Sequence, residues 1–420
     1  MDRKLAVSGI AMWLLFAAAL LAAPLLPGGA TISLLSQIGT AMIFGLSYNM
    51  LLGQGGMLSF GHAVYSGMGA FCTAHALNLA GIGAVEIPVT LMPLVGGLAG
   101  MAFGIVSGYV LTKKSGTTFA MITLGLVELV FASTLVFPQF FGGEGGISTN
   151  RVIAPTVLGV DYGSQREVYY LIALWLFLST AAMAGFTATP LGRLINAVRD
   201  NHERVQSIGF DPQYVRYLTL ILSAFFAGIA GALSAIDFES VSAESVSATR
   251  SGAILLFTII GGAGFFIGPM VGALIGVLLT VALSDITPAW HLYLGLFFML
   301  IVRYAPGGIT GVLALHLPLA KSGRLGRVLP WQLAIIAASL MAVVAIVLMI
   351  EMLYWLSHGM ADHAVMQVFG LELAPARGAS WYVAIALLIA GVVGFYLARP
   401  NFQRVWHTAH HDLSPDRVPP

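Results

Sequence analysis

The sequence predicts an all-α polytopic membrane protein, and three observations support this fold class. Of the 420 residues, 58% are hydrophobic and only 9% are charged, whereas a soluble domain carries about 25% charged residues. Apolar stretches recur at about the 20 residues that a membrane-spanning helix needs. They lack the short alternating runs of a transmembrane β-barrel. We therefore expect a bundle of membrane-spanning helices.

About twelve apolar stretches are long enough to count as candidate spans. The first resembles a signal peptide, but Pro24 and the length of the stretch favour an uncleaved span. The eighth and ninth are short, so one re-entrant element in place of two crossings is the alternative. The stretches are 8–27, 31–52, 60–80, 87–112, 117–138, 168–188, 214–236, 252–266, 268–284, 290–305, 331–351 and 379–398.

Basic residues are distributed unevenly over this topology. If the N-terminus is cytoplasmic and each stretch crosses once, all but four of the 19 Lys and Arg residues lie at the inner face. The four outer ones are Arg151, Arg166, Arg250 and Arg377. This bias follows the positive-inside rule and predicts that both termini are cytoplasmic.

Three stretches are polar enough to lie outside the membrane: 138–167 and 237–250 on the outer side and 189–212 on the inner side. Apolar residues of the inner stretch recur near helical spacing among charges. We expect a short amphipathic helix there, followed by a turn at Gly209 and Pro212.

Glycines recur at helical spacing in two places, which predicts close helix packing within the chain or with a partner. A loose likeness also links GGMLSFGHAVYSGMGA (55–70) with GGAGFFIGPMVGALIG (261–276). Glycine-broken segments in matching places of two halves point to a transport pathway. The two ladders are Gly96, Gly100, Gly104 and Gly108, and Gly268, Gly272 and Gly276.

Sequence motifs for catalysis are absent. No G-x-x-x-x-G-K-[ST], H-E-x-x-H or G-x-S-x-G run occurs. ATP hydrolysis would therefore need a separate chain, and we expect no cofactor, no catalytic residue and no nucleic-acid partner. Cys72 is the single cysteine, which excludes an internal disulfide and a multi-cysteine metal site.

Three side chains within predicted spans are candidates for chemistry. Glu128 lies near the middle of a span, where a charged carboxylate facing lipid costs about 3 kcal/mol or more. A structural hydrogen bond and a role in the solute path are both compatible with it. His62 and Tyr65 lie one helical turn apart, and both packing and contact with solute are open for them.

Four motifs follow one another along the chain. YNMLLGQGGMLSFGHAVYSGMGAF (48–71) contains Asn49, Gly53, Gly56, Ser59, Gly61, His62 and Ala63. FAMITLGLVEL (119–129) and FGGEGGI (141–147) contain Thr123, Leu124, Glu128, Gly142, Gly143 and Gly146. LGRLINAVRDNHERVQSIGFDP (191–212) contains Gly192, Arg193, Ala197, Arg199, Asn201 and Gly209. The last is SGAILLFTIIGGAGFFIGPMVGA (251–273).

In this order the motifs resemble the permease subunits of branched-chain amino acid ABC importers, of the LivM and LivH type, and the second motif is similar to the LivM branch. The likeness covers about residues 1–316 and ends at YAPGGITGVL. His202 and Arg204 stand where the family has small residues. The resemblance implies a permease domain of about ten helices at 1–316, an extension at 317–400 with two further spans, and a disordered cytoplasmic tail at 401–420.

The resemblance also implies partners. It implies a non-catalytic subunit of the bacterial inner membrane, with a LivH-like second permease, two ABC ATPase subunits that bind ATP, and a soluble solute-binding protein. The outer loops would receive that protein through Glu144, Asp161, Glu167, Asp237, Glu239 and Glu244.

Two groups of site residues follow from the resemblance. The ATPase-coupling loop would comprise Gly192, Arg193, Ala197, Arg199, Asp200, Asn201 and Gly209. The pathway or gate would comprise Asn49, Gly53, Gly56, Ser59, Gly61, His62, Tyr65, Thr123, Glu128, Gly261, Gly262, Gly264, Gly268 and Pro269.

Other functions are compatible with the residues. A permease of the same kind for urea, amides or aromatic acids is one. A proton-coupled secondary transporter with Glu128 as the proton site, or a passive channel, is another. For the extension, peripheral packing and a regulatory or partner-docking role are both open.

Overall fold

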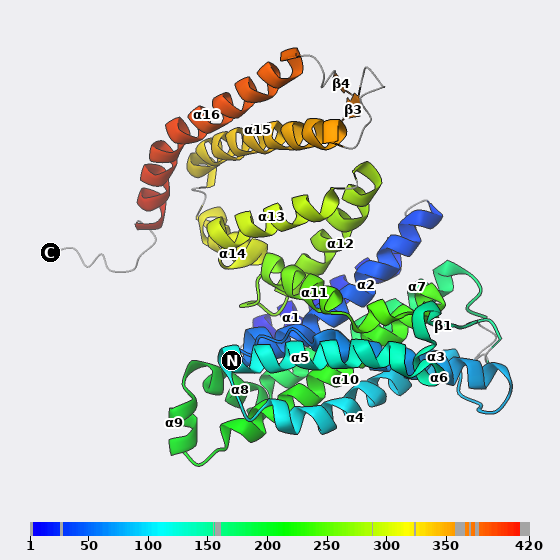
Figure 1. Cartoon of the computed structure of the whole chain (residues 1–420). Helices are drawn as coiled ribbons and strands as arrows, with labels where there is room; N and C mark the ends of the chain where they lie inside the picture. The colour runs from blue at the N-terminus through cyan, green and yellow to red at the C-terminus, as the bar shows by residue number, and fades with distance from the viewer. Residues whose placement is uncertain are drawn as a thin grey trace. The chain divides into compact units, whose positions relative to one another are not determined.

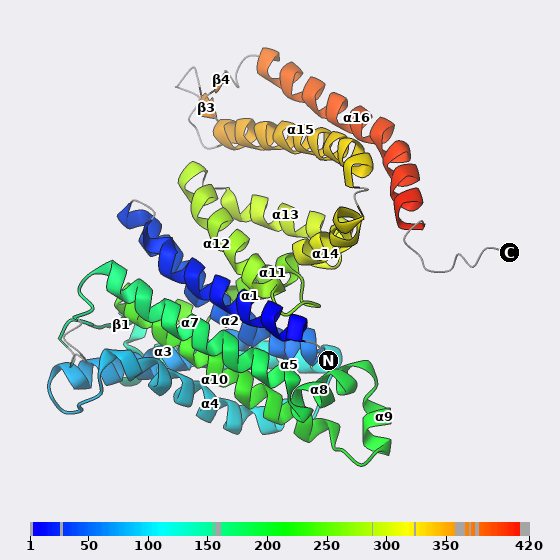
Figure 2. The same cartoon turned by 180° about the vertical axis from the view of Figure 1, so that it is seen from behind.

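A computed structural model describes residues 3–25, 28–153, 155, 161–287, 289–322, 325–357, 366–368, 371–373 and 378–411. The chain forms two compact units, one ending at Val312 and the other beginning at Leu313. Figures 1 and 2 show that helices make up nearly all of the described structure.

The α-helices of the first unit are α1 (Arg3–Ala22), α2 (Gly29–Asn49), α3 (His62–Gly81), α4 (Met92–Leu111), α5 (Gly116–Val136), α6 (Pro138–Phe141), α7 (Gln165–Ala188), α8 (Pro190–Asp200), α9 (His202–Ser207), α10 (Pro212–Phe238), α11 (Ala248–Gly261), α12 (Gly268–Ile286) and α13 (Trp290–Tyr304). Short turns are η1 (Ala23–Leu25), the π-helical η2 (Met50–Gln54), η3 (Val89–Leu91), η4 (Gly143–Gly145) and η5 (Ala243–Val246). Strands β1 (Ile147–Ser148) and β2 (Ser240–Val241) pair antiparallel.

Helix α14 (Gly308–Lys321) crosses the boundary between the units. The second unit contains α15 (Leu325–Ser357), the antiparallel strands β3 (Met366–Val368) and β4 (Leu371–Leu373), and α16 (Gly378–His411). Buried Leu348, Met352 and Trp355 of α15 pack with Ala384 of α16. We expected disorder from residue 401, but α16 continues through Pro400 to His411. Residues 412–420 of the expected tail lie outside the described residues.

Fewer helices qualify as membrane spans than the sequence predicts. Among the described helices, eight are long and apolar enough to cross a membrane, or nine if the bent pair Trp290–Tyr304 and Gly308–Leu319 is one span. Helix α3 covers the predicted stretch 60–80, but polar residues such as His75 and Asn78 lower its hydropathy. The stretches 252–266 and 268–284 form two separate helices. Helix α11 has 14 residues, about 21 Å, which is short of the roughly 30 Å of a bilayer core.

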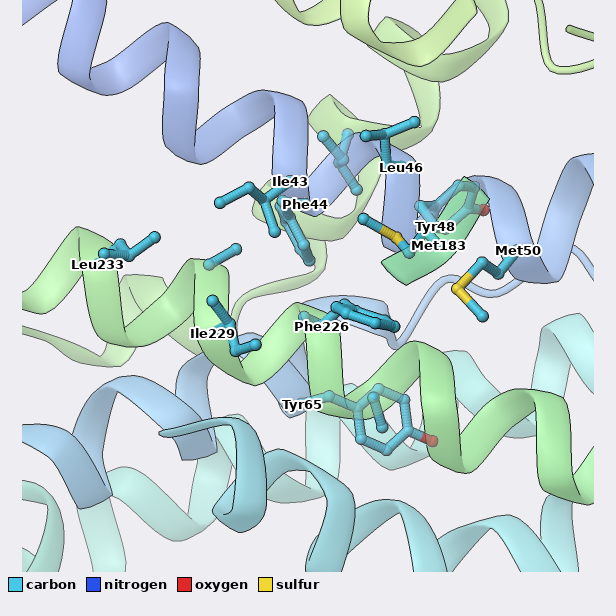
Figure 3. Packing of buried hydrophobic residues seen from close by; sticks show 14 of the residues in the cluster. Ile43, Phe44, Leu46, Tyr48, Met50, Tyr65, Met183, Phe226, Ile229 and Leu233 are labelled. Atoms are coloured by element: carbon cyan, nitrogen blue, oxygen red, sulfur yellow. The ribbon is translucent and has the colours of Figure 1, made fainter. Parts of the chain in front are cut away.

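Helix α10 is the centre of the first unit, because it packs against α2, α3, α4 and α7. Figure 3 shows Phe226, Ile229 and Leu233 of α10 among buried side chains that include Ile43 and Phe44 of α2. On the side of α4, a Cβ added to Gly100 would lie 3.0 Å from the Gly228 Cα atom. The glycine ladder of α4 therefore packs within the chain.

The second glycine ladder also packs within the chain. A Cβ at Gly272 would meet the carbonyl oxygen of Phe257, and one at Gly276 would meet the Phe257 ring. The ladder of α12 thus allows α11 to approach closely, as small residues at helix interfaces do.

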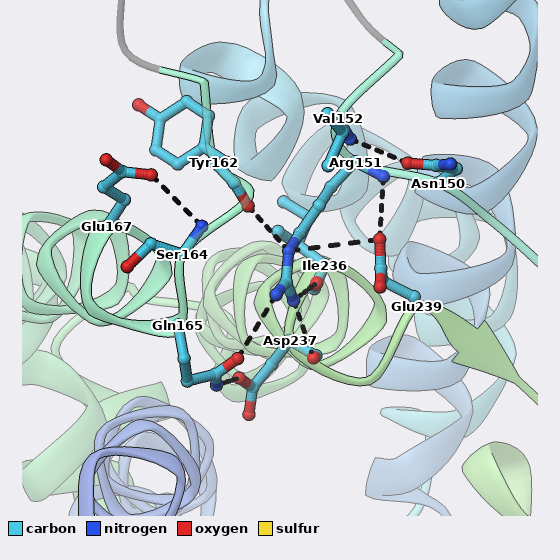
Figure 4. Close-up of polar contacts among 10 residues, drawn as sticks. All are labelled: Asn150, Arg151, Val152, Tyr162, Ser164, Gln165, Glu167, Ile236, Asp237 and Glu239. Atoms are coloured by element: carbon cyan, nitrogen blue, oxygen red, sulfur yellow. Dashed lines mark hydrogen bonds and ion pairs between the residues drawn. The ribbon is translucent and has the colours of Figure 1, made fainter. Parts of the chain in front are cut away.

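Arg151 fastens the end of α10 that lies opposite α8 and α9 (Figures 1, 2 and 4). Its side chain is 8% exposed. It donates to the carbonyl oxygens of Ile236 and Asp237 at 3.0 Å and of Tyr162 at 2.8 Å. A cation at a helix C-terminus satisfies carbonyls that have no partner in the helix.

The same contacts correct the role expected for two acidic residues of the outer loops. Asp237 is 8% exposed and accepts a hydrogen bond from Gln165. Glu239 accepts from the backbone nitrogen of Arg151 at 3.0 Å. These two carboxylates bind within the chain, whereas Glu144, Asp161 and Glu244 are exposed. Glu167 completes the N-terminal capping box of α7 with Ser164.

Candidate functional site

Helix α2 passes into the π-helical turn Met50–Gln54, and the chain then leaves helical geometry until α3 begins at His62. We call residues 55–61 the break. Gly56 has φ +62°, in the left-handed region that glycine adopts without strain. The glycines of the opening motif thus predicted an interrupted helix correctly.

Side chains of three helices satisfy the backbone around the break. Tyr48 of α2 donates its hydroxyl to the Ser59 carbonyl oxygen at 2.9 Å. The Phe60 nitrogen donates to Thr123 Oγ1 of α5 at 3.1 Å. The Ala63 nitrogen, at the start of α3, donates to Ser251 Oγ of α11 at 2.9 Å. Because non-helical backbone at membrane depth must be hydrogen-bonded within the protein, these contacts hold the break in place.

His62 and Tyr65 are packed inside the bundle, with exposures of 0% and 1%. The Ser47 hydroxyl donates to the Phe44 carbonyl at 2.7 Å, so its lone pair faces His62 Nε2 at 3.0 Å and favours the Nε2–H tautomer. The His62 ring stacks on Phe44 with centroids 5.4 Å apart. Neither His62 nor Tyr65 lines the two cavities considered below. The structure thus gives both residues a packing position.

The turn before the first glycine-rich segment (55–70) lies against the second glycine-rich segment (261–276). Asn49 Nδ2 donates to the Phe265 carbonyl at 3.4 Å. A Cβ at Gly53 would meet the Ala263 carbonyl oxygen. The turn between α11 and α12 is closely packed. A Cβ at Gly261 would meet the Gly268 carbonyl oxygen, and one at Gly262 (φ +112°) would meet the Gly307 carbonyl oxygen. A Cβ at Gly45 of α2 would lie 3.3 Å from the Pro269 side chain.

Two predicted pathway residues stand apart from this cluster. A Cβ at Gly264 would have no atom within 4 Å. Glu128 is exposed on α5, on a face that also exposes Met121, Leu124 and Leu129. Glu128 therefore lies away from the break and from both cavities, whereas Thr123 of the same motif contacts the break directly.

The expected inner amphipathic helix is two helices, α8 and α9. Asn201 separates them, since its side chain accepts a hydrogen bond from the Arg204 nitrogen at 2.9 Å and caps α9. An Asn side chain is a favoured helix N-cap. The turn at Gly209 is confirmed by its φ of +89°. Pro212 does not belong to that turn, because it is the first residue of α10.

Arg199, at the end of α8, joins the predicted coupling loop to the break. Its Nη1 donates to the Gly53 carbonyl oxygen. A Cβ at Gly56 would lie 2.8 Å from Arg199 Cγ, and Arg199 Nε pairs with Asp200 at 3.0 Å. From the sequence, Arg199 is expected in the coupling loop, and Gly53 and Gly56 are expected in the pathway or gate. No sequence pattern indicates that these residues are in contact.

The other residues of the coupling loop divide into packed and exposed ones. Gly192 is buried, and a Cβ there would meet the Phe186 carbonyl oxygen. Its nitrogen donates to Thr189 Oγ1 at 3.2 Å, the N-cap of α8. Arg193 and Ala197 are exposed on α8. This side of α8 is therefore not covered by the rest of the bundle at Arg193 and Ala197.

A cavity of about 190 Å³ lies among α2, α10, α11 and α12. We call it the Arg250 cavity. Arg250 Nη2 donates to Ser234 Oγ at 3.3 Å, and its guanidinium carbon lies 6.0 Å from the Phe44 ring centroid. Among the described residues, no carboxylate lies within 4 Å of this guanidinium. Most of the remaining wall is apolar, formed by Ala41, Ala230, Ala253, Ile254, Phe257 and Val277.

From the sequence, Arg250 is expected in an outer loop, whereas it lies in the first turn of α11 and lines the cavity. The available signal is that Arg250 directly precedes the Ser-Gly motif at 251, where an apolar helix begins. Along α2, residues 37–44 line the cavity and residues 49–54 contact the second glycine segment and Arg199. The Arg250 cavity, the break and the end of α8 thus follow one another along α2. In the part of the chain that the structure describes, no cluster of three or more His, Cys, Asp or Glu residues forms a metal site.

Replacing Thr123 by Val removes the acceptor of the Phe60 nitrogen at nearly constant volume. An unsatisfied buried donor costs about 1–3 kcal/mol, so we expect a lower melting temperature. Thr134→Val is the matched control, because Thr134 is buried on the same helix but bonds only to the Phe131 carbonyl. Thermal unfolding of the purified variants measures the difference, and equal melting temperatures would contradict this role of Thr123.

Comparison with known proteins identifies the family of the chain. The profile of the permease component of branched-chain amino acid transport systems matches residues 30–303. The LivM high-affinity branched-chain amino acid permease of Salmonella typhimurium is 28% identical over 67% of this chain and 70% of its own. Its Escherichia coli counterpart is 27% identical over 72% and 75%. The galactofuranose transporter permease YtfT of Escherichia coli is 26% identical over 60% and 68%. No solved structure is significantly similar. The chain, with its interrupted helix and its glycine ladders, therefore belongs to the family of permease components of branched-chain amino acid transport systems.

Proposed function

We propose that this multi-pass membrane protein is the permease subunit of an ATP-driven importer for branched-chain amino acids. The LivM relatives support this solute class. Identity alone does not select it, because a galactofuranose permease is 26% identical. The Arg250 cavity is the observation that favours an amino acid.

The lining of the Arg250 cavity matches the two ends of an apolar amino acid. A guanidinium binds a carboxylate through parallel charge-assisted hydrogen bonds, and Arg250 has no carboxylate within 4 Å among the described residues. Ile254, Phe257 and Val277 supply an apolar wall. Neutral solutes such as a sugar or urea gain no ion pair there. At about 190 Å³, the cavity is below the roughly 300–1,000 Å³ of sites for drug-sized ligands, which favours a small aliphatic acid over an aromatic one.

The contact of Arg199 with Gly53 supports a coupling role for α8 and α9. A partner that moves α8 also moves the carbonyl to which Arg199 donates. The break and the segment at Gly261–Gly268 would then shift between the Arg250 cavity and the inner face. Such transmission as a rigid-body movement is common in switching proteins.

The proposal assigns the other activities to partner chains. Two ATPase subunits would bind ATP and dock on the exposed side of α8 and on α9. A soluble binding protein would deliver the solute at the opposite end, where Glu144, Asp161 and Glu244 are exposed. A second permease subunit would cover the face of α5 with Glu128, since a carboxylate facing lipid is unfavourable. The charge distribution favours α8, α9 and both termini on the cytoplasmic side of a bacterial inner membrane.

Reconstitution tests the function as a whole. We expect proteoliposomes with the chain, its second permease, the ATPase subunits and the binding protein to accumulate radiolabelled leucine only with ATP. Blocking ATP hydrolysis in the partner should stop uptake. Leucine uptake by the chain alone, driven by a proton gradient, would contradict the proposal and favour a secondary transporter.

Replacing Arg250 by Gln should remove recognition of the solute carboxylate. Hydrogen bonds to charged groups contribute about 1.5–3 kcal/mol, so we expect a loss of about ten- to a hundredfold in leucine affinity. Calorimetric titration of the purified chain with leucine and leucinamide measures this directly. The unmodified chain and Arg166→Gln, an exposed arginine of α7, should prefer leucine, whereas R250Q should bind both equally. An unchanged preference in R250Q would exclude Arg250 from solute binding.

Replacing Arg199 by Ala should uncouple the importer. With its hydrogen bond to Gly53 removed, we expect ATP hydrolysis in the assembled complex to continue while uptake falls about tenfold or more. Arg303→Ala is the control, since Arg303 is an exposed arginine on α13 away from the break. Parallel assays of phosphate release and leucine uptake give the ratio. Normal uptake by R199A would refute the coupling contact.

A further inference from the structure

A second cavity, of about 180 Å³, lies where α5 and α10 begin, beside the break and the end of α8. We call it the Arg216 cavity. Its walls are mostly polar and include three basic side chains, Arg199, His202 and Arg216, together with Ser115 and the backbone of Gly56 and Gly116. It shares no lining residue with the Arg250 cavity.

Arg216 is the unusual member of this cavity. Arg216 is 8% exposed. Its guanidinium nevertheless has no hydrogen bond and no carboxylate within 4 Å in the described part of the chain. Asp211, the N-cap residue of α10, accepts from the Gln213 nitrogen at 2.9 Å and acts on the Arg216 charge only from beyond 4 Å. Buried charges in proteins are normally paired and hydrogen-bonded. An unpaired buried cation facing a cavity therefore indicates an anion as its partner.

The rest of the lining also favours a negatively charged ligand. Helix α5 begins at Gly116, and Ser115 makes no side-chain cap, so its first amides are unoccupied. A helix N-terminus carries a partial positive charge and free N–H donors, which suit an oxyanion. Lys113 and Lys114 directly precede Ser115 and are exposed. Among the residues that the structure describes, the one acidic side chain bonded to this lining is Asp200, which pairs with Arg199 Nε.

We propose that the Arg216 cavity binds a phosphate oxyanion, supplied by the headgroup of an anionic phospholipid. Its depth favours a lipid over free phosphate. Helix α5 has 21 residues, about 31 Å, which matches a bilayer core of roughly 30 Å. Gly116 and the adjoining cavity therefore lie at the level of the headgroups. Basic pockets between transmembrane helices on the cytoplasmic side are a known form of lipid headgroup site.

The position of the site gives the lipid a role in coupling. Arg199 lines the Arg216 cavity and also donates to the Gly53 carbonyl oxygen. A phosphate between Arg199 and Arg216 binds the end of α8 to the start of α10, directly beside the break. Anionic lipid thus stabilises the joint through which the coupling helices contact the membrane-spanning part.

Thermal unfolding of the full chain in a neutral detergent tests the site. The additions are phosphatidylglycerol, phosphatidylcholine and inorganic phosphate, and the variants are Arg216→Gln and the control Arg303→Gln. A ligand that binds only the folded state raises the melting temperature. We expect phosphatidylglycerol to raise it by several degrees in the unmodified chain and in R303Q, but not in R216Q.

The sign of the variant's effect distinguishes a binding site from a structural arginine. Without anionic lipid, R216Q should be at least as stable as the unmodified chain, because it removes an unpaired buried charge. With phosphatidylglycerol the order should reverse. A melting temperature of R216Q that is lower by the same amount in every lipid would overturn the proposal.

The remaining outcomes identify the source of the anion. An increase with inorganic phosphate at equal phosphorus, again lost in R216Q, supports the oxyanion site and assigns it to free phosphate. An equal increase with phosphatidylcholine, or an increase retained in R216Q, overturns it, as does no increase with either anion. If R216Q does not fold, Arg199→Gln removes the cation of the opposite wall. The increase with phosphatidylglycerol must then shrink, and an unchanged increase refutes the site.

Discussion

The structure of the first unit depends on hydrogen bonds to a short stretch of non-helical backbone inside the bundle. The amide nitrogens of residues 58–61 donate no helical hydrogen bond, and lipid offers no substitute partner. Tyr48, Thr123 and Ser251 supply the missing partners from α2, α5 and α11. The position of the break therefore depends on three helices at once. The same requirement explains why polar residues occur at these places in apolar helices.

The interruption also determines where a functional connection can exist. A continuous α2 would keep its carbonyls within the helix, whereas the π-helical turn leaves the Gly53 carbonyl free to accept from Arg199. Earlier in the chain, residues 37–44 of α2 line the Arg250 cavity. The break that follows α2 lines the Arg216 cavity with Gly55 and Gly56. Two cavities of opposite character, one largely apolar and one polar, thus adjoin the same interrupted helix.

Composition and glycine placement predicted the membrane-helical class, the interruption of α2 and the turn at Gly209. The contacts that give these features a function could not be predicted, because they join residues far apart in sequence. Thr123 lies 63 positions from Phe60, and Arg199 lies 146 from Gly53. Local polarity misplaced Arg250, since a basic residue at the start of a helix reads as part of the preceding loop. The acidic residue Asp237 was misplaced at the other end of a helix, because a charged residue in the last turn of α10 also looks like part of a loop. Asn201 shows that a cap can divide a well-formed amphipathic pattern.

Arg151 has a mechanical consequence. It holds the last carbonyls of α10 to the loop before α7, while α8 and α9 adjoin the other end of α10. With 27 residues, α10 is a rod of about 40 Å. Arg151 therefore fixes the position of this end of α10, and a partner that moved α8 and α9 would displace the end near Arg216 farther than the end that Arg151 holds.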